Sequence, residues 1–192
     1  AALLVVWYHI HEGFAFAGAV NGVSDGSITS INHGYLAVDF FFILSGFVIG
    51  YAYDDRWKRG FTRKEFFRRR LIRLHPMVVM GAVLGVVCFM IQGGTMWDGT
   101  EVPGKALLLA LLLAMLMIPV VPGSIGEVRG NGEMFPLNGP TWSLFFEYIG
   151  NILYALVLRR LSTKWLAAVT LLSGVGLAAY ALSGMSGFWH LG

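Results

Sequence analysis

The chain has 192 residues, of which 56% are hydrophobic and 13% are Asp, Glu, Lys or Arg. A soluble domain usually has about 25% charged residues, so this composition excludes an ordinary soluble protein and indicates an integral membrane protein. The formal net charge is +3, and nine of the fourteen Lys and Arg residues lie between Arg56 and Arg73. Such a basic segment between apolar runs is a membrane-topology signal rather than a nucleic-acid surface. The single cysteine, Cys88, excludes a disulfide within the chain.

Six apolar stretches have about the length needed to cross a bilayer, which is about 20 residues for a helix. They are residues 1–20, 35–53, 76–92, 105–121, 140–158 and 165–183. The segments between them are rich in Gly, Pro, Asn and Asp, which end helices. The sequence therefore predicts an all-α, polytopic transmembrane helix bundle with about five or six membrane segments. Because the chain starts and stops in or beside apolar runs, we expect a fragment truncated at both ends.

The basic segment, residues 54–75, is expected to contain a helix of its own. Thr62 and Glu65 have the spacing of a capping box. Pro76 marks the start of the next span. A basic amphipathic helix of this type lies on a membrane surface, and the positive-inside rule places it in the cytoplasm.

The order of the later spans conflicts with the same rule. If every span crosses, Arg159, Arg160 and Lys164 lie outside, which the positive-inside rule disfavours. One solution is that residues 105–121, which prolines interrupt, form a re-entrant segment or do not cross fully.

The first two apolar stretches each contain one polar residue that is a candidate for catalysis. His9 is in residues 1–20, and histidine is the side chain best suited to transfer protons near neutral pH. Asp39 is in residues 35–53, which we expect to run antiparallel to the first span, so that its carboxylate could orient the imidazole. The alternatives are a structural contact or a headgroup-level position for His9, and a helix-dipole role for Asp39. No ligand cluster accompanies His9, so we expect no metal site.

Three arginines at the mouth of the third span form a candidate phosphate site. Arg70 and Arg73 are three residues apart, and Arg69 and Arg73 are four apart, so each pair shares a helical side. Guanidinium groups bind phosphates through forked, charge-assisted hydrogen bonds. The alternative is binding of anionic lipids combined with topology setting.

A carboxylate also interrupts the fifth apolar stretch, in the sequence NGPTWSLFFEYIG. Glu147 lies one or two turns into this stretch, and a carboxyl in such a place can act as a general acid or base. The alternative is that Glu147 pairs with an arginine or a backbone group for structural reasons. Trp142 can also be explained as an interfacial anchor.

Four motifs in order carry a resemblance to a known family. They are AALLVVWYH, GYLAVDFFFILSGFVI, RRRLIRLHP and NGPTWSLFFEY. Together they resemble the acyltransferase 3 family of polytopic membrane acyltransferases, over essentially the whole chain. The second and fourth motifs are the most specific, because their polar residues are not expected from hydropathy. The resemblance implies a single membrane acyltransferase domain over residues 1–192.

By this resemblance, His9 is the histidine of the family's arginine-to-histidine motif, whose arginine would fall just before Ala1. It implies a catalytic role for His9, assisted by Asp39 or Glu147. The implied acyl-CoA-binding residues are Arg69, Arg70 and Arg73. Further candidates from the same motifs are Ser45, Asn138, Trp142 and Ser143.

The family moves acyl groups, commonly acetyl, from acyl-CoA to a hydroxyl of a carbohydrate or cell-envelope glycan. The resemblance implies acyl-CoA as donor substrate with no bound cofactor, and a multi-pass protein of the bacterial inner membrane. Lipid and a glycan acceptor are the expected partners, and nucleic acid is not. The alternative is a proton-coupled transporter in which His9, Asp39 and Glu147 form a relay, although the sequence has no internal repeat.

Overall fold

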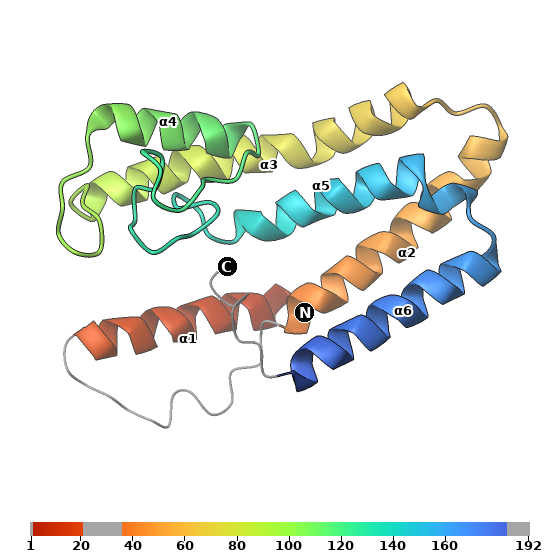
Figure 1. Ribbon diagram of the computed structural model, residues 1–192. Coiled ribbons are helices and arrows are strands. Elements are labelled where there is room, and N and C mark those ends of the chain that lie inside the picture. The colour runs from red at the N-terminus through yellow and green to blue at the C-terminus, as the bar shows by residue number, and fades with distance from the viewer. Residues whose placement is uncertain (1, 21–35, 184–192) are drawn as a thin grey trace. The chain divides into compact units, whose positions relative to one another are not determined.

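The computed structural model describes residues 2–20 and 36–183, and its regular elements in these ranges are helices (Figure 1). The helices are α1 (Ala2–Val20), α2 (Leu36–Lys58), α3 (Arg63–Ile91), α4 (Gly104–Met115), α5 (Thr141–Leu156), the short 3₁₀ helix η1 (Leu158–Arg160) and α6 (Thr163–Leu182). Each of the six apolar stretches overlaps one α-helix. The predicted all-α class is confirmed.

Four helical segments in the described part of the chain are long and apolar enough to cross a membrane. They are Leu36–Lys58, Arg63–Ile91, Thr141–Arg160 and Thr163–Tyr180. This confirms the prediction of a polytopic transmembrane protein.

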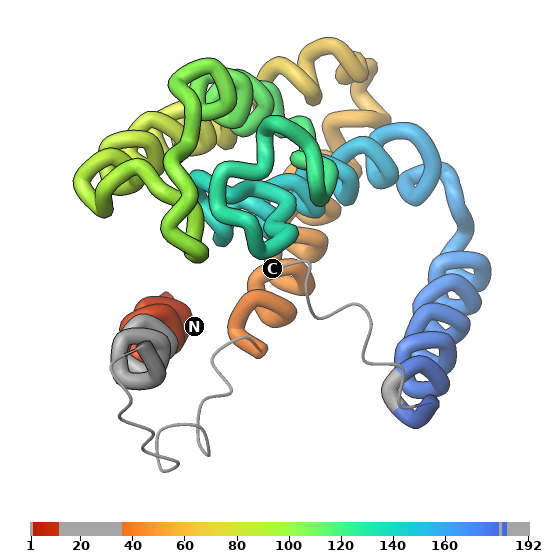
Figure 2. The backbone as a smooth tube through the Cα atoms, turned by 60° about the vertical axis from the view of Figure 1, so that its left-hand side comes forward, coloured from red at the N-terminus to blue at the C-terminus, as the bar shows by residue number. Residues whose placement is uncertain are grey.

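The chain forms two compact units, Ala1–Gly60 and Phe61–Gly192. In the first unit, α1 and α2 contact each other. In the second unit, α3 contacts both α4 and α5. Figures 1 and 2 show α4 along the C-terminal half of α3 and α5 along its N-terminal half.

The N-terminal cap of α3 was predicted correctly, but a separate basic helix was not found. The Thr62 Oγ1 accepts the Glu65 N–H at 3.3 Å, and Glu65 Oε2 accepts the Thr62 N–H at 2.9 Å, which makes the capping box. From there, however, residues 63–74 form the first turns of α3, which continues through Pro76 to Ile91.

The helix is continuous because a stripe of buried residues on α3 extends on both sides of Pro76. Proline removes one helical hydrogen bond and favours a break. The stripe on α3 nevertheless repeats every three or four residues on both sides of it, so packing against α4 and α5 favours one continuous helix. Its members are Phe66, Arg70, Leu74, Val78, Ala82, Gly85 and Phe89.

Helix α4 is too short to cross the membrane. Its 12 residues give about 18 Å at 1.5 Å per residue, against a hydrocarbon core of about 30 Å. The helix ends before the prolines because Met117 adopts a φ of 56°. The Met117 N–H donates to Ala114 O at 3.1 Å and the Ile118 N–H to Leu113 O at 2.9 Å, the pattern of a Schellman cap. Of the two solutions considered for this stretch, the length favours incomplete crossing.

The segment between α4 and α5 folds back onto α3. Its residues Val128 and Leu137 join a buried cluster with Phe89 of α3 and Ala106 and Ala110 of α4. The contact with α3 is close because a Cβ atom at Gly85 would lie 2.2 Å from the Leu137 carbonyl oxygen. Glycine is therefore the residue that allows the chain just before α5 to approach α3.

Candidate functional site

The first unit holds His9 and Asp39 on two helices in contact. Both residues are exposed, and the His9 ring lies edge-on to the Tyr8 ring at a centroid distance of 5.3 Å. Asp39 is in the first turn of α2, where a carboxylate complements the helix dipole. No described hydrogen bond or ion pair links Asp39 to His9 in residues 2–20 and 36–58, so their predicted pairing stays a prediction. Ser45 lies half-buried further along α2.

The three arginines of the candidate phosphate site have different surroundings. Arg69 and Arg73 are exposed, and the Arg69 guanidinium lies 5.4 Å from the centroid of the Phe61 ring. Arg70 instead belongs to the buried stripe, with its side chain 4% exposed. Sequence spacing predicted a shared side for Arg70 and Arg73, but packing directs Arg70 inward while Arg73 remains accessible.

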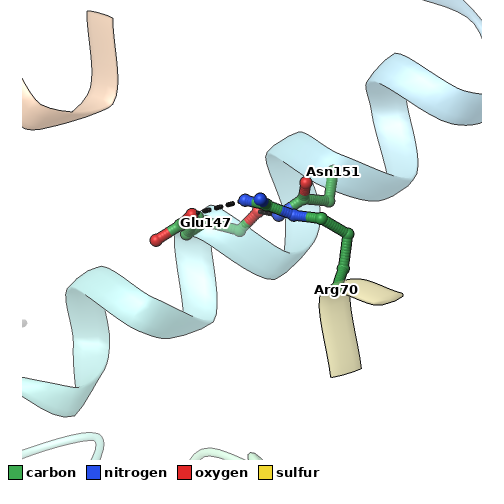
Figure 3. Close-up of polar contacts among 3 residues, drawn as sticks. All are labelled: Arg70, Glu147 and Asn151. Carbon is green, nitrogen blue, oxygen red and sulfur yellow. Dashed lines mark hydrogen bonds and ion pairs between the residues drawn. The ribbon is translucent and has the colours of Figure 1, made fainter. Parts of the chain in front are cut away.

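The buried Arg70 side chain forms an ion pair across α3 and α5, 77 residues away in sequence. Its Nη2 donates to Oε1 of Glu147 at 2.7 Å (Figure 3). The Glu147 side chain is 22% exposed, so the pair is mostly shielded from the surroundings. Two residues that were assigned separate roles, donor binding and acid–base catalysis, are therefore direct partners.

Asn151 completes this group one turn after Glu147. Its side chain is 2% exposed, and Nδ2 donates to the main-chain oxygen of Glu147 at 2.7 Å (Figure 3). Its Oδ1 is buried with no hydrogen-bond partner among the described residues. Sequence reasoning assigned Asn151 no role. The available signal was an amide four residues after an intramembrane carboxylate, which places both on one helical side.

The start of α5 positions the remaining candidates. The Asn138 carbonyl accepts the Thr141 N–H at 3.0 Å, which forms a turn before the helix. The Ser143 hydroxyl donates to Pro140 O at 2.9 Å, and the half-buried Trp142 ring lies 6.1 Å from the Phe146 ring centroid. Ser143 therefore has a local structural partner.

The Asn138 side chain rests on α3 at a glycine. A Cβ atom at Gly81 would lie 2.6 Å from Asn138 Nδ2, one turn from the close approach of Leu137 to Gly85. The sequence signal for this contact was the four-residue spacing of two glycines within an apolar helix, which sequence reasoning did not use. These glycines bring the start of the NGPTWSLFFEY motif (residues 138–148, hereafter the WSLFFE motif) against the middle of α3.

Arg129 organises the segment at the other end of α3. Its guanidinium carbon lies 4.8 Å from the Phe89 ring centroid and 5.0 Å from that of Trp97. Nη1 donates to Gln92 Oε1 at 2.8 Å, and Nε donates to Pro136 O at 3.2 Å. Burial lowers the pKa of Arg129 from its usual value, but an arginine keeps its charge in proteins. Arg129 thus holds the segment before α5 to the C-terminal end of α3.

The second unit therefore has two ends of different character. One end carries exposed arginines beside a buried Arg70–Glu147 pair, and α5 runs antiparallel to α3 toward that end. The opposite direction of the two helices follows from three contacts: Phe66 with Tyr154, Arg70 with Glu147, and Gly81 with Asn138. The other end holds the folded segment that leads into the WSLFFE motif.

Comparison with known proteins identifies the family. The family model described as an acyltransferase domain matches residues 1–191. "Protein 2 in picA locus" of Rhizobium radiobacter is 36% identical over 155 residues, which cover 77% of this chain and 78% of that protein. "Acyltransferase MdmB" of Streptomyces mycarofaciens is 32% identical over 180 residues, 88% of this chain but 41% of that protein. This chain thus spans less than half of the second relative, and no solved structure matches it.

The match covers nearly the whole chain and includes all four motifs on which the resemblance rested. Three of the helices that carry those motifs, α2, α3 and α5, are among the four described segments that are long and apolar enough to span a membrane. The chain belongs to the acyltransferase 3 family and is a multi-pass membrane acyltransferase.

Proposed function

We propose that this protein transfers an acyl group, most simply acetyl, from acyl-CoA to a hydroxyl of a carbohydrate or cell-envelope glycan. The observation that carries this proposal is the family match over residues 1–191 together with exposed arginines at the end of a membrane-length helix. An acyl-CoA donor carries several phosphates, and guanidinium groups are the side chains best suited to bind them. A location in a bacterial inner (plasma) membrane agrees with the four membrane-length helices and with the bacterial source of both relatives.

In the proposed donor site, Arg69 and Arg73 contact the phosphates of acyl-CoA. Both side chains are exposed on the first turns of α3. α3 has 29 residues, about 43 Å at 1.5 Å per residue, which exceeds the hydrocarbon thickness of about 30 Å. Its basic first turns can therefore extend into the headgroup region, where a water-soluble donor is accessible.

In the proposed reaction, the acceptor hydroxyl attacks the thioester carbonyl carbon. A C–O bond forms, the C–S bond breaks, and the CoA thiolate leaves and is protonated. His9 takes the hydroxyl proton as general base and Asp39 orients its imidazole, as a carboxylate does in other acyl transfers. A second route, equally compatible with a histidine, has the His9 imidazole accept the acyl group first and pass it to the hydroxyl.

Substitution of His9 in the full-length protein tests this proposal. The His9→Ala variant should be present in membranes at the normal level. These membranes should nevertheless lose transfer of label from radioactive acetyl-CoA to a glycan acceptor. Asp39→Asn should lower transfer if Asp39 orients the imidazole, and should leave it unchanged if Asp39 serves the helix dipole alone. Near-normal transfer by His9→Ala would refute the assignment.

The same label distinguishes the two routes. Without acceptor, the acyl-histidine route leaves label on the wild-type protein and none on His9→Ala, whereas the general-base route leaves neither labelled. Proton-coupled flux of a solute without any label transfer would instead support a transporter.

A further inference from the structure

Arg70 is the one charged member of the buried stripe on α3. The other members of the stripe are apolar or glycine, whereas Arg70 carries a guanidinium that is 4% exposed. A buried charge is strongly destabilising unless it is paired and hydrogen-bonded. The Glu147 carboxylate supplies that pairing at 2.7 Å. Arg70 is therefore placed where its removal or reorientation would leave Glu147 without its cation.

Two polar residues on successive turns of α5 lie beside this guanidinium. Glu147 provides a carboxylate, and Asn151 lies four residues later on the same side of the helix. The Asn151 amide is fixed by its hydrogen bond to the Glu147 main chain, and Figure 3 shows the Arg70 guanidinium reaching α5 beside both residues. A buried ion pair between one residue of each helix favours one position of α3 along α5 as well as one distance between the two helices.

The same helix pair sets the position of the WSLFFE motif. Phe66 contacts Tyr154 one turn toward the N-terminus of α3, at a ring-centroid distance of 5.7 Å. Asn138 rests on Gly81 further along α3 in the opposite direction. A shift of α5 by one turn would break these contacts together, so the ion pair and the glycine contact specify one register.

We propose that Arg70 is a positioning residue that locks the register of α3 against α5, and that Arg69 and Arg73 bind the donor phosphates without it. The part concerning phosphates rests on the proposed function. Its physical basis is that one edge of the Arg70 guanidinium already binds a carboxylate, and a phosphate could take that edge only by displacing Glu147. Arg69 and Arg73 present exposed guanidinium groups and require no such exchange.

An experiment that exchanges the two charges tests, through the unfolding temperature, whether the Arg70–Glu147 pair fixes the register of α3 against α5. Arg70→Glu and Glu147→Arg, each alone, should lower the unfolding temperature of the detergent-solubilised protein because each leaves two like charges facing each other. The double variant Arg70→Glu/Glu147→Arg should recover most of that loss. Arg73→Glu serves as the matched control, because its side chain is exposed on the same helix, and it should leave the unfolding temperature near that of the wild type. Equal loss in the double variant and the two single variants would overturn the lock.

Binding of CoA tests the role of Arg70 without measuring catalysis. This separation is needed because Glu147 is itself a candidate catalytic residue. Arg69→Gln and Arg73→Gln should each weaken CoA binding about tenfold, the effect of one lost charge-assisted hydrogen bond. The charge-exchanged double variant should bind CoA within about threefold of the wild type. A stable double variant that binds CoA as poorly as Arg73→Gln would show that Arg70 contacts the phosphates and would overturn the proposal.

A second double variant provides the same test if the Arg70→Glu/Glu147→Arg protein does not fold. Arg70→Met/Glu147→Met removes both charges at similar volume, a replacement that buried ion pairs often tolerate. If it folds, retained CoA binding supports the positioning role and lost binding refutes it. If the wild type itself fails to bind CoA, the donor assignment under the proposed function fails, while the unfolding temperatures still decide whether the pair locks the register.

Discussion

The close approach of Leu137 to Gly85 gives the most quantitative prediction for the fold that carries the site. In Gly85→Ala, the new Cβ atom would lie 2.2 Å from the Leu137 carbonyl oxygen and 2.8 Å from its carbonyl carbon. An ordinary carbon–oxygen contact is about 3.3 Å, so the two segments must separate by about 1 Å. Because the obstructing atoms belong to the main chain, no rotation of a side chain can relieve the contact.

The expected cost follows from two opposing effects. Overpacking of this kind costs about 1–3 kcal/mol, and a main-chain clash belongs at the upper end of that range. Replacing glycine by alanine within a helix stabilises the helix by about 1 kcal/mol, which offsets part of this cost. We therefore expect Gly85→Ala to destabilise the protein by about 2 kcal/mol, which corresponds to a decrease of about 4–8 °C in unfolding temperature for a chain of this size.

Two further glycines provide a graded control in the same assay. A Cβ at Gly81 would meet the end of the Asn138 side chain at 2.6 Å, which can rotate away, so Gly81→Ala should cost less than Gly85→Ala. A Cβ at Gly174 in α6 would meet nothing within 4 Å, so Gly174→Ala should be neutral or slightly stabilising.

Thermal unfolding of the three purified variants in one detergent, followed by tryptophan fluorescence, is the measurement. Acyl transfer should fall in the same order, because the segment at Leu137 leads directly into α5. If Gly85→Ala unfolds at the temperature of Gly174→Ala, the inferred close contact and the reasoning built on it are wrong.

Two further predictions concern topology and the segment before α5. If α4 does not cross the membrane, single cysteines introduced at Asp98 and Ser162 in a Cys88→Ala protein should be accessible from opposite sides of the membrane. A membrane-impermeant thiol reagent should label position 98 in intact cells and position 162 only in inverted vesicles, and labelling of position 162 in intact cells would mean that α4 crosses. Arg129→Lys should lower the unfolding temperature by several degrees, because lysine cannot reproduce the guanidinium fork and its aromatic contacts. The exposed Arg68→Lys change is the control, and equal effects of the two would contradict the role given to Arg129.

Local sequence features predicted the helices well. Hydropathy located the six stretches that overlap α1 to α6, and the capping-box spacing located the start of α3 at Thr62. These features depend on residues close in sequence, so a single chain is enough to read them. The four motifs likewise identified the family, which the match over residues 1–191 confirms.

What sequence reasoning missed depends on packing between distant segments. Pro76 predicted a break, but the buried stripe that contacts α4 and α5 keeps α3 continuous. The alternative that Glu147 pairs with an arginine is confirmed, but the sequence did not identify that arginine as Arg70. The two residues are 77 apart, and they meet because α3 and α5 lie side by side. Met117 gave no signal for the end of α4, because a residue other than glycine at positive φ is uncommon.

The short α4 also offers a solution to the conflict between hydropathy and charge. If α4 does not cross, then α5, which runs antiparallel to α3, ends on the same side of the membrane as the start of α3. Arg159, Arg160 and Lys164 are then on the side of the basic segment, as the positive-inside rule requires. Hydropathy does not distinguish a 12-residue apolar helix from part of a membrane-spanning helix. The positive charges that flank the spans instead indicate how the spans are oriented. If the cysteine labelling agrees, the distribution of basic residues is a better guide to the number of crossings than hydropathy alone.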